Sequence, residues 1–270
     1  MSGSDAANYI LQNSATNTKA DITPKNLTIT GLTASNKVYD STPTATVSGT
    51  AQLSGSVAAG AGTSSDGKWY VNDDVSVSGS ATGTFNSPNV LSANTVTFSG
   101  LTLGGAQAGN YTLVASQAAT ITPRTVTLSA NKTYDGSNTL SGSQVTIGNT
   151  AGSQSLNYSS ATSNDPYVLT AGKYINAITL ADGTGVASNY QLPTLNATNA
   201  PVTITTKALT VTDTRANNKL YDGTTTATLN SGKLNGVVGT DSVSIDYPSA
   251  KGNFDDGPVW GYNKPVSFSD

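Results

Sequence analysis

One short motif occurs three times in this chain and restricts the folds available to it. It reads Asn36-Lys37-Val38-Tyr39-Asp40 in the first copy, Asn131-Lys132-Thr133-Tyr134-Asp135-Gly136 in the second and Asn218-Lys219-Leu220-Tyr221-Asp222-Gly223 in the third. The copies are spaced by about ninety residues, which is long enough for each repeat to close its own hydrophobic core. We therefore expect several small domains in series and not one large core.

An alternating segment precedes each copy of the motif. At residues 22–30, 121–128 and 204–211, an Ile-Thr pair leads into apolar residues at every second position, which is the pattern of a half-buried β-strand. Similar strands follow each copy, and no segment has helical periodicity over three turns. The expected fold class is all-β, with at most one short helix or turn per repeat, at residues 104–109 in the first one.

A closing Asn-Tyr signature stands ten to fourteen residues before each Ile-Thr strand, at Asn8-Tyr9, Asn110-Tyr111 and Asn189-Tyr190. Two divisions of the chain follow from these signatures. If a repeat begins at the Ile-Thr strand, the parts are a tail strand of a preceding repeat at 1–21, complete repeats at 22–121 and 122–204, and a repeat without its last strand at 205–270. If it begins at the Asn-Tyr strand, they are 1–100, 101–187 and 188–270.

Each repeat is expected to be a small antiparallel β domain, and the domains to lie end to end as a rod. Strand number and alternation fit both a grasp-like sheet and an immunoglobulin-like sandwich. Pro24 and Pro123 in the Ile-Thr segments have a fixed φ and lack a donor, which suits an edge or a junction between domains.

The composition excludes several classes of function. The 270 residues include no cysteine and no histidine, which removes disulfides, thiolate and imidazole chemistry and the usual zinc ligands. The 13 Lys and Arg residues are scattered singly, so neither nucleic acid nor a membrane surface is an expected partner. No Gly-x-Ser-x-Gly elbow precedes a helix. We expect no catalytic residues, and hydrolysis by a pair of carboxylates is the one enzyme class left open.

The Tyr-Asp-Gly part of the motif predicts a corner between a strand and a turn. Aspartate can accept a hydrogen bond from the amide two residues on, glycine supplies a positive φ, and tyrosine buries its ring. The first copy has Ser41 at the glycine position. A row of sugar-stacking tyrosines is the functional alternative. We assign a structural role to Lys37, Tyr39, Asp40, Lys132, Tyr134, Asp135, Gly136, Lys219, Tyr221, Asp222, Gly223, Asn110, Tyr111, Asn189 and Tyr190.

The recurring lysines, the two tryptophans and two acidic pairs have alternative interpretations. Lys37, Lys132 and Lys219 are expected to be paired or snorkelling cations, the alternative being a self-formed Lys-Asn amide crosslink. Trp69 and Trp260 are either partly buried or exposed platforms for a glycan. Asp73-Asp74 and Asp255-Asp256 are solvated turns or calcium ligands, but no calcium-loop pattern is present. No metal or cofactor is therefore expected.

Several motifs in a fixed order resemble a known family. They are Asn-Lys-x-Tyr-Asp-Gly with the threonine-rich residues 224–228, Gly-Val-Val-Gly-Thr-Asp-Ser-Val-Ser at 236–244, Val-Thr-Phe-Ser-Gly-Leu-Thr-Leu at 96–103 and Ala-Gly-Asn-Tyr-Thr-Leu at 108–113. With these motifs, nearly the whole chain is similar to the YDG and MBG repeat domains of very large secreted bacterial adhesins. Those adhesins are the filamentous-haemagglutinin-like exoproteins of two-partner secretion.

The resemblance implies grasp-like β units and a non-catalytic stalk or scaffold that extends a binding tip. It implies export across the outer membrane to the cell surface or beyond, and roles in attachment, aggregation or biofilm formation. The partners implied are neighbouring repeats, other copies, a host surface or an exopolysaccharide. A carbohydrate-binding module is the alternative function.

Overall fold

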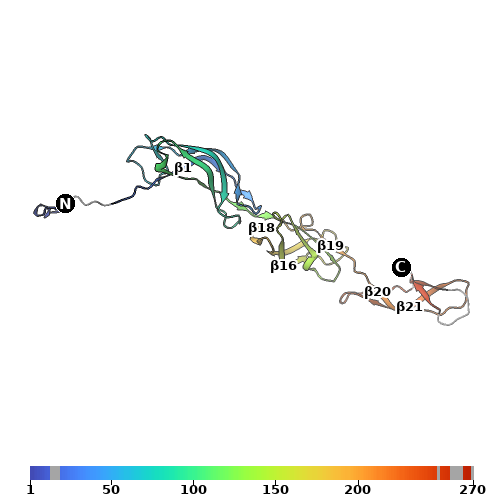
Figure 1. Cartoon of the computed structure of the whole chain (residues 1–270). Helices are drawn as coiled ribbons and strands as arrows, with labels where there is room; N and C mark the ends of the chain where they lie inside the picture. Colours follow the sequence, from blue (N-terminus) through green and yellow to red (C-terminus); the bar gives the residue numbers. More distant parts are fainter. Residues whose placement is uncertain (13–18, 248–249, 256–263, 269–270) are drawn as a thin grey trace. The chain divides into compact units, whose positions relative to one another are not determined.

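The computed structural model describes residues 1–12, 19–247, 250–255 and 264–268, and the chain is all-β (Figure 1). Within those residues the helical elements are the 3-10 turns η1 (Ala6–Asn8), η2 (Ala108–Asn110), η3 (Gly142–Gln144) and η4 (Ala187–Asn189). The turn η2 overlaps the stretch where a short helix is expected from the sequence. No helix of the described residues has the length and apolarity to span a membrane.

The chain forms two compact units, Met1–Thr122 and Pro123–Asp270. The strands of the first unit are β1 (Lys25–Ala34), β2 (Lys37–Val38), β3 (Thr44–Ala45), β4 (Val47–Leu53), β5 (Ser56–Val57), β6 (Trp69–Tyr70), β7 (Ser76–Phe85), β8 (Thr95–Gly104), β9 (Tyr111–Val114), β10 (Ser116–Ala118) and β11 (Ile121–Thr122). They form sheets in the order β4-β1-β9 and β10-β8-β7-β3, with the separate pairs β5-β6 and β11-β2.

A bulge in β1 shows why glycine is required at one position of the first sheet. The register of β1 against β4 shifts between Thr30 and Leu32. Gly31 lies there with a φ of 79°, and a Cβ added to it would lie 2.2 Å from the carbonyl oxygen of Thr50. Only a residue without a side chain allows the two backbones to approach this closely.

The second unit contains the remaining strands. They are β12 (Arg124–Thr125), β13 (Thr127–Thr133), β14 (Thr139–Leu140), β15 (Val145–Gly148), β16 (Leu156–Ser163), β17 (Ile175–Asp182), β18 (Tyr190–Gln191), β19 (Val202–Thr205), β20 (Thr210–Ala216), β21 (Thr226–Asn235), β22 (Lys251–Phe254) and β23 (Val266–Phe268). The sheet orders are β15-β13-β19, β14-β16-β17 and β20-β21-β22-β23, with the pair β12-β18.

The sheets are mixed, so the expectation of purely antiparallel domains is wrong in this respect. The closing Asn-Tyr strands lie parallel to the opening strands, as β9 does to β1 and β18 to β12. The Ile-Thr segments also pair in parallel, β11 with β2 and β19 with β13. The physical reason is connectivity: each returning strand comes after a long crossover through another hairpin, and such crossovers permit parallel neighbours.

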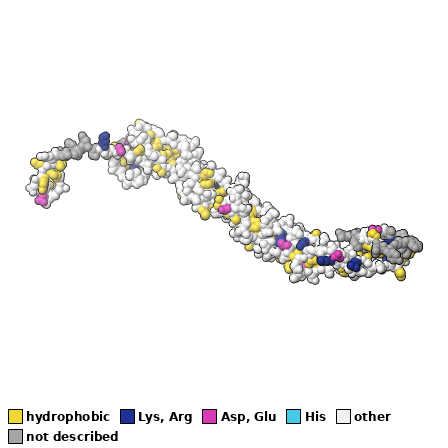
Figure 2. Space-filling model, turned by 60° about the horizontal axis from the view of Figure 1, so that its bottom comes forward, with side chains coloured by type: hydrophobic (Ala, Val, Ile, Leu, Met, Phe, Trp, Pro, Cys, Tyr) yellow, Lys and Arg dark blue, Asp and Glu magenta, His cyan; other side chains and the backbone are white. Residues whose placement is uncertain are grey.

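The hydrophobic cores are formed by every second residue of the strands, as the alternating sequence pattern predicts. In β13, Leu128, Ala130 and Lys132 are buried while the residues between them are exposed. In the first unit Leu27, Phe85 and Val96 are among the buried apolar side chains. On the face of the molecule seen in Figure 2, uncharged side chains and backbone make up most of the surface and charged side chains are few.

Candidate functional site

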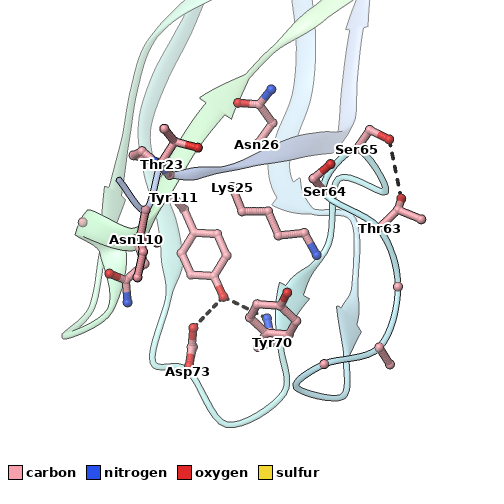
Figure 3. A pocket seen from close by; sticks show the side chains of 16 residues that line it. Thr23, Lys25, Asn26, Thr63, Ser64, Ser65, Tyr70, Asp73, Asn110 and Tyr111 are labelled. Carbon is pink, nitrogen blue, oxygen red and sulfur yellow. Dashed lines mark hydrogen bonds between the residues drawn. The ribbon is translucent and has the colours of Figure 1, made fainter. Parts of the chain in front are cut away.

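A pocket of about 840 Å³ opens in the first unit where the strands β1 and β9 begin (Figure 3). Three segments that are far apart in the sequence form it: the Ile-Thr-Pro entry to β1, the loop between β5 and β6 with the residues after it, and the turn η2 with the start of β9. The lining residues are Ile22, Thr23, Pro24, Lys25, Asn26, Gly60, Ala61, Gly62, Thr63, Ser64, Ser65, Tyr70, Asp73, Gly109, Asn110 and Tyr111.

Tyr111 lines this pocket, and two hydrogen bonds hold its ring in place. The turn η2 ends at Tyr111, which opens β9 and pairs with Lys25 of β1. Its hydroxyl donates to the Asp73 carboxylate at 2.5 Å and accepts the backbone N–H of Tyr70 at 3.0 Å. Burial, and then the neighbouring Asp73 carboxylate, raise the pKa of Tyr111. The phenol therefore acts as a neutral crosslink between strands that are distant in sequence.

Lys25 contributes a buried positive charge to the same pocket. Its ammonium lies 2.8 Å from an Asp66 carboxylate oxygen and 4.6 Å from the centre of the Tyr70 ring. The bond from Lys25, together with the amides of Lys68 and Thr63, lowers the pKa of Asp66 to about 2. Asp66 is thus ionised at neutral pH and has no proton to donate to a substrate. The arrangement suits recognition of a hydroxyl or an aromatic ring.

The Tyr-Asp corners form a second recurring arrangement. In each copy the lysine ammonium pairs with the aspartate three residues on: Lys37 with Asp40 at 2.7 Å, Lys132 with Asp135 at 2.7 Å and Lys219 with Asp222 at 2.8 Å. The same carboxylate oxygen accepts the amide of Thr42, Ser137 or Thr224, two residues further along. The lysines are therefore ion-paired, as the simpler interpretation of their recurrence expects.

The residue that follows the aspartate has a similar positive φ in all three copies. The φ values are 69° at Ser41, 75° at Gly136 and 77° at Gly223. Ser41 therefore adopts the conformation that glycine takes in the other two copies, although an L-residue pays a steric cost there. Its hydroxyl donates to the carbonyl of Asp40.

The tyrosines of the three corners differ in their surroundings. Tyr39 is buried and Tyr134 is half-buried, whereas Tyr221 is exposed. Within the second unit, the Tyr134 hydroxyl donates to Asp241 at 2.8 Å, and this bond raises the pKa of Tyr134. Tyr134 also lines a smaller pocket with Lys207, Leu209 and Val238. The corner of the second repeat therefore contacts the third repeat.

The Asn-Tyr signatures hold the closing strands in place. Tyr190 opens β18 and is buried, and its hydroxyl donates to Gln154 and accepts the amide of Ala151. Asn189 before it is fully buried, while Asn110 of the first repeat is exposed. A buried tyrosine therefore opens both closing strands, β9 and β18, whereas the burial of the preceding asparagine differs between them.

The remaining sequence candidates do not assemble into one site. Trp69 is half-buried in β6 and does not line the pocket, and Trp260 and Asp256 lie outside the described residues. Asp74 accepts the amide of Ala106, and Asp255 accepts the Ser267 hydroxyl. Across the described residues, no group of three or more potential metal-binding acidic side chains is present.

Lys25 and the loop at residues 60–65 are the parts of the pocket that sequence reasoning missed. A signal for the lysine existed, because a basic residue stands at the same place in each Ile-Thr segment, as Lys25, Arg124 and Lys207. The loop has no such signal, since it is present only in the longer first repeat.

Comparison with known proteins gives a match to a family model. The family model described as the YDG domain matches residues 23–120 and 205–270, more than half of the chain. No curated protein and no solved structure matches this chain significantly.

Proposed function

This chain belongs to the YDG domain family, and we propose that it is a non-catalytic stalk or scaffold segment of a large bacterial surface or secreted adhesin. In this role it extends a binding tip away from the cell and contributes to attachment, aggregation or biofilm formation. The units are grasp-like β domains, and they follow one another as a stiff rod.

The observation that carries the proposal is the way in which the chain passes from repeat to repeat. The strand β19 is hydrogen-bonded to β13 of the second repeat, and the four residues 206–209 lead from it to β20 of the third. Only Pro123 separates β11 from β12. Connections this short restrict the freedom of successive domains far more than flexible linkers do.

The composition supports export. A chain with no cysteine forms no disulfide that would hinder its passage through a membrane in an unfolded state. Detection of the chain on intact producing cells by an antibody, without permeabilisation, tests the surface location. Detection only after permeabilisation would place the chain inside the cell and overturn this part of the proposal.

Small-angle scattering of the purified chain tests the stalk. We expect a long, asymmetric distance distribution, and a compact globular one would overturn the proposal. Insertion of a Gly-Ser segment between Thr122 and Pro123 should broaden the distribution. The same insertion after Leu169, which is an exposed loop residue, is the matched control and should leave the distribution unchanged.

A carbohydrate-binding module is the second candidate, favoured by the aromatic ring of Tyr70 beside Lys25 in the pocket of Figure 3. Stacking of a sugar on such a ring is a common recognition mode. A glycan array with the wild-type chain and with Tyr70→Ala and Trp69→Ala tests it. Binding that depends on Tyr70 would support the module, and no binding to any glycan would exclude it.

A further inference from the structure

The closing segment of the second repeat leaves a gap beside the start of β13. Before the gap, the Val126 N–H donates to the carbonyl of Gln191 at 3.0 Å, and after it the Ala130 N–H donates to the carbonyl of Pro201 at 2.9 Å. Three residues lie between these two bonds on the β13 side, against nine, residues 192–200, on the other. The longer segment therefore loops away from the sheet and leaves part of the β13 edge without a neighbouring strand.

Two prolines explain why the parallel ladder is interrupted here. In such a ladder, a residue that donates its N–H to one residue of the neighbouring strand accepts, at its carbonyl, the N–H of the residue two positions further on. The donor for the Val126 carbonyl would therefore be residue 193, and the donor for the Leu128 carbonyl would be residue 201. Both are proline, and proline has no N–H. The sequence thus leaves two carbonyl oxygens without their ladder donors.

The N–H of Leu128 is also unpaired. Backbone N–H groups point to alternate edges of a strand, so that of Leu128 points to the same edge as those of Val126 and Ala130. No hydrogen bond joins it to the closing segment, all of which lies in the described part of the chain. Val126 and Leu128 are nevertheless only 1% and 4% exposed. Because buried backbone polar groups almost always have a partner, this donor and the two acceptors point to an occupant of the gap.

A groove of about 560 Å³ opens over the gap. Its polar side chains are four hydroxyls and two amides, those of Thr127, Ser129, Thr146, Thr198, Asn149 and Asn199. The four hydroxyls bond to no other side chain or backbone group of the described chain. Pro193 and Pro201 complete one wall, and the described lining contains neither a charged side chain nor an aromatic ring.

We propose that this groove binds an uncharged sugar residue of a polysaccharide. A sugar hydroxyl both donates and accepts, so one ring can satisfy the N–H and the two carbonyls of the gap as well as the unbonded hydroxyls of the wall. A charged ligand has no opposite charge in the lining to pair with. An extended peptide does not fit, because Gln191 and Pro201 occupy the ladder positions on either side of Leu128 and a strand could not continue past them.

This groove is distinct from the pocket of Figure 3. It belongs to another repeat, and that pocket is built around Lys25 and the ring of Tyr70. The inference does not rest on the stalk role. If both hold, the stalk contacts polysaccharide along its length and not only through a tip.

Hydrogen exchange of the free chain, followed by NMR, tests the gap. The N–H of Leu128 should exchange at least about tenfold faster than those of Val126 and Ala130, since both neighbours are hydrogen-bonded. Equal protection of the three amides would show that the gap is closed and would overturn the proposal.

Titration with neutral trisaccharides of glucose, galactose, mannose and N-acetylglucosamine tests binding. At about 10 mM sugar, a site with a Kd of about 1 mM is nearly saturated. At least one of the four should shift the Leu128 amide resonance and slow its exchange, whereas the anionic trimer of galacturonate should do neither. No response to any neutral sugar would leave water as the occupant and overturn the proposal, as would a response to galacturonate alone.

Thr127→Ile and Thr179→Ile are matched variants for locating the site. Both threonines are exposed on strands of the second repeat, where isoleucine is favoured, so both variants should fold. Only Thr127 lines the groove. Its replacement removes a hydroxyl and narrows the groove, and should weaken binding by about tenfold or more. Thr179→Ile should leave the affinity unchanged, and equal affinities of the two variants would contradict the site.

Tyr70→Ala separates this groove from the pocket of Figure 3. It removes the ring of that pocket and should leave both the affinity and the shift of the Leu128 amide unchanged. Binding that is lost in Tyr70→Ala but kept in Thr127→Ile would place the sugar in the first unit and overturn the proposal.

Discussion

The ammonium of Lys132 lies 2.7 Å from the carboxylate of Asp135, and the lysine side chain has no exposed surface. It also donates to the carbonyl oxygens of Ser137 and Thr139, at 2.9 Å each. All three donors of the ammonium are thus used, and the charge connects the end of β13 to the turn that follows it. This relationship explains why a lysine can occupy a core position of a small β domain.

Replacement of Lys132 by methionine should destabilise the second repeat by about 2 kcal/mol, because the Asp135 carboxylate and the part-buried carbonyl oxygens of Ser137 and Thr139 lose their donor. Hydrogen exchange of the β13 amides measures the loss in that repeat alone. Lys219→Met is the matched control. Lys219 is partly exposed, so its loss should be under about 1 kcal/mol. Equal losses in the two variants would contradict the role of burial.

Ser41→Gly should stabilise the first unit by about 0.5 kcal/mol. Glycine removes the left-handed strain at a φ of 69°, and this gain exceeds the added entropy of the unfolded chain. Gly223→Ala is the reciprocal change at a φ of 77°, where a Cβ meets no atom within 4 Å, so it should cost about 1 kcal/mol through backbone conformation alone. Urea titrations of both variants provide the check, and a destabilised Ser41→Gly would refute the prediction.

Acid should destabilise the first unit through Asp66. Its pKa is about 2 in the folded chain, below the value of about 3.9 in an unfolded one. The contribution of Asp66 to stability is therefore fully present above about pH 5 and is lost progressively as the pH falls through the unfolded value towards 2. Unfolding free energies measured across this range should depend less on pH in Asp66→Asn, and likewise in Lys25→Met. An unchanged pH dependence in both variants would show that this pair does not set the acid response.

Tyr111→Phe should cost the first unit about 1–2 kcal/mol, because the amide of Tyr70 loses its acceptor and Asp73 its donor. Thermal unfolding and hydrogen exchange at β6 are the measurements. Tyr167→Phe changes an exposed tyrosine and should leave stability within about 0.5 kcal/mol of the wild type. A similar effect of the two changes would argue against the buried crosslink.

The local chemistry of the corner could be predicted from the sequence, because it depends on neighbours in the chain. The bond from the amide of Ser137 to Asp135 and the positive φ at Gly136 follow from residue type alone. The burial of the Lys132 side chain could also be predicted from the sequence pattern. The alternation of Leu128 and Ala130, continued by one step, places Lys132 on the inner face of β13.

The parallel pairings and the pocket could not be predicted in the same way. Alternation identifies Ile121 as a strand residue, but nothing near it in sequence indicates that Lys37 is its partner. The pocket requires Lys25, Asp73 and Tyr111 to meet, and these residues come from three separate segments. Long-range pairing is decided by the packing of the whole domain, which a local pattern does not contain.

The parallel pairing of β1 with β9 determines how the first repeat responds to mechanical force. Four residue pairs, from Lys25 and Tyr111 to Thr28 and Val114, join the two strands. Stretching the chain pulls residue 24 and residue 115 in opposite directions along the strand axes, so the interstrand hydrogen bonds are loaded in shear. They must then rupture together, whereas the bonds of a hairpin pulled at its open end unzip one after another.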